Sequence, residues 1–181
     1  MLEAAGVPFR AVQADVDEER AKESLRGLGG ADLALALATV KALGARSGEG
    51  DLVLGSDQTL ELDDGAMLDK PKSREEVFLQ LKRLGGSSHR LHSAAVVAEA
   101  GQPAWSGIET VELSMRPLSD EFLESYLDAE YEAIRWSVGG YRIEGPGIQL
   151  FERIEGSHFA ILGMPLLPLL GFLRSRGVVP S

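Results

Sequence analysis

The feature that most constrains this fold is a short apolar run that ends in a polar cluster. Leu52–Leu54 is apolar and is typical of a buried strand, and Gly55–Ser56 then interrupts the run. Asp57 and Gln58 follow at the end of the strand. In α/β proteins, ligands gather where strands end and loops diverge. A carboxylate there can accept a proton from water or bind a divalent cation, and the alternative is an ordinary turn acid after a core strand.

Helix and strand signals lie on both sides of this strand. Ala31–Arg46, rich in Ala and Leu, is the strongest predicted helix. Ser73 and Glu76 form a capping box that opens a second helix. His89–Ala100 and Ala104–Met115 are predicted to form an antiparallel hairpin, joined by Gly101-Gln102-Pro103. Shorter elements are expected elsewhere: a strand at Val7–Val12, a helix from Asp15 to Arg26, a helix from Ser119, a strand at Phe151 and a closing helix at Met164–Arg176.

Composition narrows the class of protein. The 181 residues suit one domain or a compact two-lobed one, and 44% apolar with 25% charged residues is typical of a soluble protein. The sequence has no run of about 20 apolar residues, and its start lacks the features of a signal peptide. The absence of cysteine excludes disulfides, Cys-based metal sites and Cys nucleophiles. These features predict a cytoplasmic protein that does not span a membrane.

The charge balance restricts the partners. A net charge of −10 argues against nonspecific nucleic-acid binding, which requires Lys and Arg to neutralise phosphates. A small phosphorylated ligand remains compatible with it, because two or three well-placed lysines can hold a triphosphate, especially beside a bound cation.

Four polar residues are candidates for a site. Asp57 could be a general base or a cation ligand, and Lys41 and Lys70 could hold phosphates as compact positive charges. Glu144 lies in a glycine-rich loop that can approach a ligand closely, and a carboxylate there is a plausible reader of guanine. For both lysines and for Glu144, simple solvent exposure is the alternative.

The histidines and serines support no other site. His89, His92 and His158 lack the spacing of a metal site, and the first two would face opposite sides of a strand. We therefore expect them to be structural or partly exposed. Ser93 has no ordered His and Asp partners, so a catalytic triad is unsupported.

Several separated stretches of the chain resemble one known family. They are Leu54-Gly55-Ser56-Asp57-Gln58, Leu68-Asp69-Lys70-Pro71-Lys72, Leu81-Lys82-Arg83-Leu84-Gly85-Gly86, His89 with Ser93, Glu144-Gly145-Pro146-Gly147, Leu150–Gly156 and Leu162–Leu166. Their order and spacing are similar to those of the Maf (septum-formation) proteins along essentially the whole chain. The resemblance implies an α/β fold with a long, twisted, mixed central sheet, flanking helices and two lobes around a cleft, similar to the inosine-triphosphate pyrophosphatases. It also suggests a homodimer.

The resemblance also implies an activity. A Maf protein of this kind would hydrolyse a nucleoside triphosphate between the α and β phosphates, giving a nucleoside monophosphate and pyrophosphate with Mg²⁺ or Mn²⁺ as cofactor. Asp57 would activate water, Lys41 and Lys70 would hold phosphate oxygens, and Glu18 matches a family acid near the metal, so that Glu18 and Asp57 are the implied metal ligands.

Two positions bear on the substrate that the resemblance implies. Many family members carry Gln where this chain has Glu144, and Lys where it has Ser137. Ser56-Asp57-Gln58 together with Glu144-Gly145-Pro146-Gly147 is more similar to the branch acting on 7-methyl-GTP than to the branch acting on dTTP and UTP. A carboxylate at position 144 suits the N1–H and N2–H₂ donors of guanine, whereas an amide can serve a pyrimidine.

The start of the chain departs from the family pattern. The family opens with a strand and a Ser-x-Ser-x-Arg-Arg phosphate loop, before the helix that here begins at Met1–Gly6. The resemblance thus implies that residues 1–181 form a single Maf-like domain without this strand and loop. We expect poor catalysis from such a chain, since each lost oxyanion donor costs about 3 kcal/mol. The alternatives are a catalytically impaired nucleotide-binding module that acts through partners in cell division, and a plain acidic interaction domain.

Overall fold

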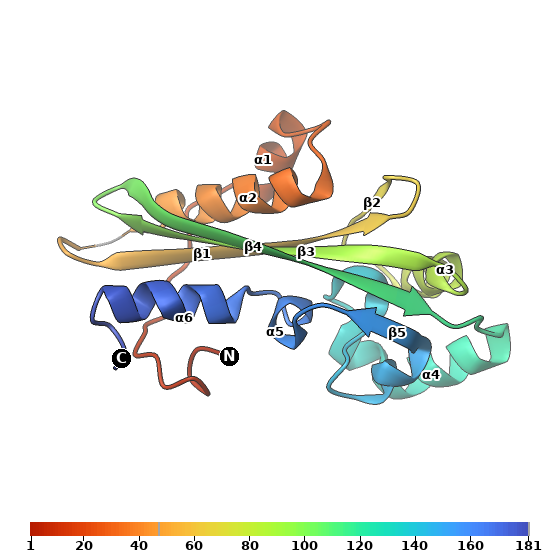
Figure 1. The fold of residues 1–181 in the computed structure, drawn as a ribbon. Coiled ribbons are helices and arrows are strands. Elements are labelled where there is room, and N and C mark those ends of the chain that lie inside the picture. The colour runs from red at the N-terminus through yellow and green to blue at the C-terminus, as the bar shows by residue number, and fades with distance from the viewer. Residues whose placement is uncertain (47, 181) are drawn as a thin grey trace. The chain divides into compact units, whose positions relative to one another are not determined.

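A computed structural model describes residues 1–46 and 48–180. These residues form a five-stranded sheet flanked by helices, with strand order β2-β1-β3-β4-β5 (Figure 1). The strands are β1 Leu52–Leu62, β2 Met67–Leu68, β3 Ser88–Glu99, β4 Gln102–Met115 and β5 Phe151–Glu155. The pairs β1–β2 and β4–β5 are antiparallel, and β3 and β4 form a hairpin. The predicted α/β class with a central sheet flanked by helices is confirmed.

The helices follow the predicted local signals. They are α1 Glu18–Ser24, α2 Gly30–Gly44, α3 Arg74–Leu84, α4 Asp120–Ile134, α5 His158–Ile161 and α6 Leu166–Ser175, with 3-10 turns η1 Val138–Gly140 and η2 Pro146–Leu150. The predicted cap at Ser73 is confirmed, because its side chain accepts a hydrogen bond from the Glu76 backbone N–H at 3.1 Å, while the Glu76 carboxylate accepts from the Lys72 backbone N–H at 2.6 Å. Among the described residues, no helix combines the length and apolar character that crossing a bilayer requires.

The chain divides into two compact units. Unit 1 comprises Met1–Gln58, Ser93–Glu109 and Ser157–Ser181, and unit 2 comprises Thr59–His92 and Thr110–Gly156. Strands β1, β3 and β4 contribute residues to both units.

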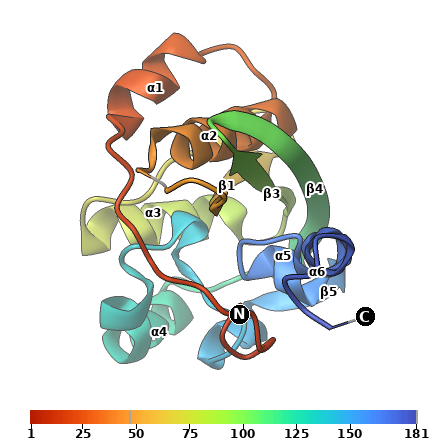
Figure 2. The ribbon, with the colours of Figure 1, turned by 90° about the vertical axis from the view of Figure 1, so that its left-hand side faces the viewer.

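In unit 1 the sheet strands carry one helix on each face. Figures 1 and 2 show α2 on one face and α6 on the other. Alternate residues of β3 explain this arrangement, since successive side chains of a strand point to opposite faces. One buried cluster joins small residues of α2 to β3: Ala34, Ala38, Ala42, Ala94, Val96 and Ala98. The other joins β3 to α6 and the N-terminal segment: Val7, Val97, Leu169 and Leu173.

The predicted strand at Val7–Val12 is wrong. This segment forms no strand, and the nearby backbone contact is an isolated bridge between Ala14 and Ala45. A cavity of about 410 Å³ separates residues 8–12 from Leu52–Leu54 of β1. Pro8 also lacks the N–H that a ladder requires. Within the described residues, β2 pairs with β1 at Leu60 and Glu61, so it does not cover Leu52–Leu54, which line this cavity.

The turn of the β3–β4 hairpin is shorter than predicted. The sequence places the connection at Gly101-Gln102-Pro103, whereas β4 begins at Gln102. Ala100 and Gly101 form the turn with φ angles of 50° and 75°. Two consecutive positive φ angles are the requirement of the two-residue hairpin turn whose twist matches the strands.

Unit 2 buries a histidine. His89 is fully buried, its Nε2 lies 2.7 Å from the Tyr141 hydroxyl, and the ring of Phe151 lies beside it. Burial lowers the pKa of His89 from its ordinary value of 6.5 to about 4. The imidazole is therefore neutral at physiological pH, and unit 2 is built around the uncharged form, as expected for a structural histidine.

This burial predicts a loss of stability in acid. Because the folded pKa is lower than the unfolded one, the contribution of His89 is complete above pH 6.5 and is lost as the pH falls toward 4. The shift corresponds to about 3 kcal/mol. Urea unfolding between pH 7 and 4 should show a shallower pH dependence for His89→Gln than for the unsubstituted chain. His158→Gln, at an exposed position, is the control. An equal dependence of the unfolding free energy on pH in His89→Gln and the unsubstituted chain would contradict the prediction.

Candidate active site

Asp57 lies on the face of β1 that is covered by α2. One carboxylate oxygen, Oδ2, is 3.1 Å from the ammonium Nζ of Lys41. The other, Oδ1, accepts a hydrogen bond of 2.7 Å from the backbone N–H of Gln58. The side chain is 16% exposed. Asp57 is thus a largely buried carboxylate that Lys41 and the Gln58 backbone hold in place, and not an exposed turn acid.

A close approach of the α2 backbone to Gly55 of β1 brings the helix near enough to the strand for this ion pair. A Cβ atom added at Gly55 would lie 2.3 Å from the carbonyl oxygen of Ala38 and 2.5 Å from the backbone nitrogen of Ala42. Only a residue without a side chain allows such an approach of helix backbone to strand. Lys41, one residue before Ala42, consequently reaches Asp57.

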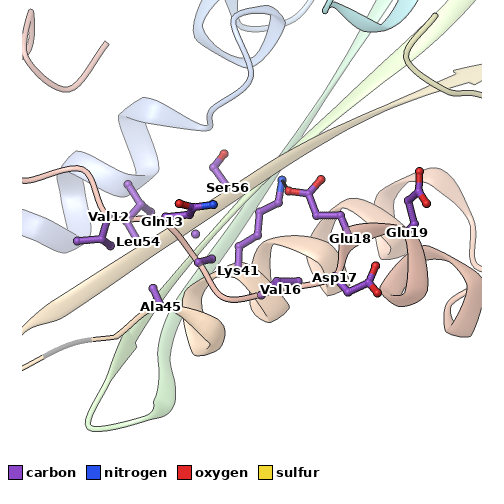
Figure 3. Close-up of a pocket in the computed structure, with 12 residues that line it drawn as sticks. Val12, Gln13, Val16, Asp17, Glu18, Glu19, Lys41, Ala45, Leu54 and Ser56 are labelled. Atoms are coloured by element: carbon purple, nitrogen blue, oxygen red, sulfur yellow. Dashed lines mark ion pairs between the residues drawn. The ribbon is translucent and has the colours of Figure 1, made fainter. Parts of the chain in front are cut away.

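A third charged residue comes from the start of α1. The Asp17 side chain caps this helix by accepting from the backbone N–H of Arg20 at 3.0 Å. Glu18 follows in the first turn, where an acid is favoured by the helix dipole. Its Oε1 lies 3.2 Å from Nζ of Lys41, and Figure 3 shows the two side chains pointing toward each other.

The two acids keep Lys41 charged. Its side chain is only 24% exposed, and burial acts against the charge. The attraction and hydrogen bonds of Asp57 and Glu18 outweigh that burial and hold the pKa of the Lys41 ammonium above its ordinary value. The alternative that Lys41 is simply exposed to solvent is therefore wrong. The cluster Glu18–Lys41–Asp57 carries one positive and two negative formal charges.

A polar cavity lies beside this cluster. Its volume is about 620 Å³, within the range of sites for small molecules. Its walls are formed by the segment before α1, the first turn of α1, Lys41 and β1 (Figure 3). They include Gln13, Asp17, Glu18, Glu19, Lys41 and Ser56. Asp57 is connected to this wall through its ion pair with the Lys41 ammonium.

The donors fit a cation shared with a substrate. No group of three or more His, Cys, Asp or Glu side chains among residues 1–46 and 48–180 is arranged to hold a metal alone. Glu18 and Asp57 nevertheless both face the Lys41 ammonium. Mg²⁺ is commonly held by one or two carboxylates together with substrate phosphates. The predicted pair of metal ligands is compatible with that chemistry.

The remaining predicted site residues belong to unit 2. Lys70 follows β2 and Glu144 lies between η1 and η2, and both side chains are exposed. Their participation in the same site as Asp57 stays a prediction. His89 and His92 are both buried, and His92 Nδ1 lies 2.9 Å from the Thr110 hydroxyl, so the expectation that they are structural is confirmed.

Sequence reasoning missed the surroundings of the cluster. Asp17 was not recognised as the cap that sets the start of α1, and Gln13 and Ser56 were not recognised as wall residues. The available signal for the cap was Asp17 itself, because Asp is favoured at the position just before the first turn of a helix. Gln58 was grouped with Asp57, although its side chain lies on the opposite face of β1 and contacts α5.

Comparison with known proteins shows which family this chain belongs to. The family described as Maf-like protein matches residues 1–176. A nucleoside triphosphate pyrophosphatase of Sphingopyxis alaskensis is 49% identical, over 100% of this chain and 93% of its own length. One of Granulibacter bethesdensis is 48% identical, over 97% and 90%. One of Caulobacter vibrioides is 46% identical, over 99% and 90%. With a match of this extent, the chain belongs to the Maf-like protein family.

Proposed function

We propose that this chain is a nucleoside triphosphate pyrophosphatase that hydrolyses the bond between the α and β phosphates. The observation that carries the proposal is the convergence of Asp57, Lys41 and Glu18 beside a polar cavity of about 620 Å³. The names of the relatives, nucleoside triphosphate pyrophosphatases from three bacteria, support the same activity.

The residues of the cluster divide the chemistry between them. Asp57 accepts a proton from a water molecule whose oxygen attacks the α phosphorus. The bond from that phosphorus to the bridging oxygen breaks, and pyrophosphate leaves with the bond's electron pair. Lys41 stabilises the negative charge that develops on the phosphate oxygens, because its ammonium already lies in a partly enclosed site. Glu18 is the second carboxylate that holds this ammonium.

A cation completes the charge balance. The cluster has one more negative than positive charge, so a triphosphate would meet a net repulsion from it. Glu18 and Asp57 would hold Mg²⁺ or Mn²⁺ together with phosphate oxygens. The bound cation would neutralise the triphosphate and polarise its phosphorus–oxygen bonds. Lys70 supplies a further positive charge for the phosphates in this proposal.

Release of pyrophosphate is the direct test. The chain should convert a nucleoside triphosphate to the monophosphate and pyrophosphate in the presence of Mg²⁺, with no nucleoside diphosphate formed. Release of inorganic phosphate would instead indicate cleavage at the γ position. Thermal stabilisation by nucleotide without any release would favour the alternative of a binding module, and absence of both would leave the plain interaction domain.

We also propose that Glu144 favours guanine over pyrimidine bases, with 7-methyl-GTP as the preferred substrate. A carboxylate can accept from N1–H and N2–H₂ together. Glu144→Gln should lower kcat/KM for GTP and 7-methyl-GTP by about 10- to 100-fold relative to UTP and dTTP, the effect of losing a charge-assisted pair of hydrogen bonds. Glu132→Gln is the matched control, because Glu132 is 81% exposed in the same unit. An unchanged ratio for Glu144→Gln would remove this residue from base recognition.

A further inference from the structure

The residues on either side of Asp57 face away from the cluster. Because strand side chains alternate, Ser56 and Gln58 point to the face of β1 opposite to α2. There Ser56 meets the segment that joins α5 to α6, and Gln58 meets α5 itself. The Ser56 hydroxyl lies 2.9 Å from the carbonyl oxygen of Gly163, and the Gln58 amide nitrogen lies 2.8 Å from that of Ala160.

These side chains act as a clamp on the carbonyl end of α5. The Gln58 amide nitrogen is also 3.1 Å from the carbonyl oxygen of Ile161 and 2.8 Å from the Ser93 hydroxyl of β3. The Ser93 hydroxyl in turn donates to the Ala160 carbonyl at 2.6 Å. An amide group has two protons to donate, and both find acceptors here. The Ala160 carbonyl also accepts a hydrogen bond from the Gly163 backbone N–H at 3.0 Å, so side chains from two strands add to the backbone bonds at the end of this four-residue helix.

The clamp is connected to Asp57 through the backbone of the same residue. The N–H of Gln58 donates to Asp57 Oδ1 at 2.7 Å, and this bond holds the carboxylate in the orientation in which its other oxygen faces Lys41. A rotation of the peptide between residues 57 and 58 would break this bond. The side chain of Gln58 resists that rotation, since its amide is held by α5 and by Ser93.

We propose that Gln58, supported by Ser93, is a positioning residue that orients the Asp57 carboxylate. The amide of Gln58 is engaged with α5 on the face of β1 opposite to Asp57, so its effect on the carboxylate passes through the backbone that the two residues share. For catalysis the inference rests on the proposed function, because the quantity that Gln58 controls is proton acceptance by Asp57.

A pair of variants separates positioning from general stability. Gln58→Met keeps the length of the side chain and removes the amide. It should lower kcat by about 10- to 100-fold with KM changed less than about twofold, as expected when a reactive group is misplaced by a fraction of an ångström to an ångström. Val97→Ala is the control, because Val97 is buried on β3 against α6 and lies outside the clamp. It should lower Tm at least as much and leave kcat within about twofold.

A conservative variant provides a rescue. In Gln58→Glu the ionised carboxylate faces the carbonyl oxygens and cannot donate, whereas the protonated carboxyl can. Its kcat relative to the unsubstituted chain should therefore rise as the pH falls from 7 toward 5. A constant ratio across this range, or equal loss of kcat in Gln58→Met and Val97→Ala, would overturn the positioning role.

A measurement without turnover keeps the inference testable if the proposed function fails. Amide hydrogen exchange at residues 56–59 and 160–164 should accelerate together in Gln58→Met and stay slow in Val97→Ala. If the unsubstituted chain releases no pyrophosphate, the proposed function is wrong, and this exchange pattern alone decides whether the clamp couples α5 to Asp57. Unchanged exchange in Gln58→Met would overturn the coupling.

Discussion

Replacing Asp57 with asparagine is expected to lower the rate of pyrophosphate release by about 10³-fold and to leave nucleotide binding nearly intact. The amide has nearly the same size as the carboxylate, so the packing of β1 against α2 is retained. It cannot accept a proton from water at neutral pH, however. Lys41 keeps Glu18 as a partner at 3.2 Å, so its ammonium stays charged and able to bind phosphate oxygens.

The measurement is the initial rate of pyrophosphate release at saturating nucleotide, with thermal stabilisation by the nucleotide as a record of binding. Asp32→Asn is the matched control, since Asp32 is an exposed acid in the first turn of α2. Glu18→Gln distinguishes the two acids of the cluster. If Asp57→Asn releases pyrophosphate at the normal rate and Glu18→Gln does not, Glu18 is the base and Asp57 is not.

Local signals in the sequence were sufficient for most elements of the fold. The Ala- and Leu-rich stretch 31–46 became α2, and the capping box at Ser73 opened α3. The apolar run at Leu52 became β1 and carried Asp57 to a polar site. Each of these depends on residues within one turn or one strand, which is the range over which propensity and capping act.

The contacts of the site depend on residues far apart in the sequence, so local patterns could not predict them, and only the family resemblance grouped Glu18, Lys41 and Asp57. A lysine within an apolar helix pattern carries no mark of its partner, so Lys41 could not be distinguished from a solvated residue. The segment 7–12 has the composition of a strand, yet a strand forms only where a neighbouring edge pairs with it. Strand alternation does place Gln58 opposite to Asp57, and applying it within the motif would have separated their roles.

Gly55→Ala is expected to destabilise the fold by about 3 kcal/mol, the upper range for overpacking of a close contact. The added methyl group would meet backbone atoms of α2 at 2.3 and 2.5 Å, so the helix itself must move. For a chain of this length the loss corresponds to a decrease in Tm of about 6–12 °C. Because Lys41 moves with α2, pyrophosphate release should also decrease. Gly171→Ala in α6, where an added Cβ meets open space, should instead stabilise the fold by about 0.5–1 kcal/mol.

The double variant Gly55→Ala with Ala42→Gly shows whether backbone atoms or side-chain atoms limit the distance between α2 and β1. If side-chain crowding were the cause, removal of the Ala42 methyl group would relieve it and the two effects would compensate. The close contacts of Gly55 are with the carbonyl oxygen of Ala38 and the backbone nitrogen of Ala42, which remain in the double variant. Urea unfolding should therefore show a larger loss in the double variant than in Gly55→Ala, by the roughly 1 kcal/mol that glycine costs within a helix. Recovered stability in the double variant would mean that side chains, and not the backbone approach at Gly55, set the distance between α2 and β1.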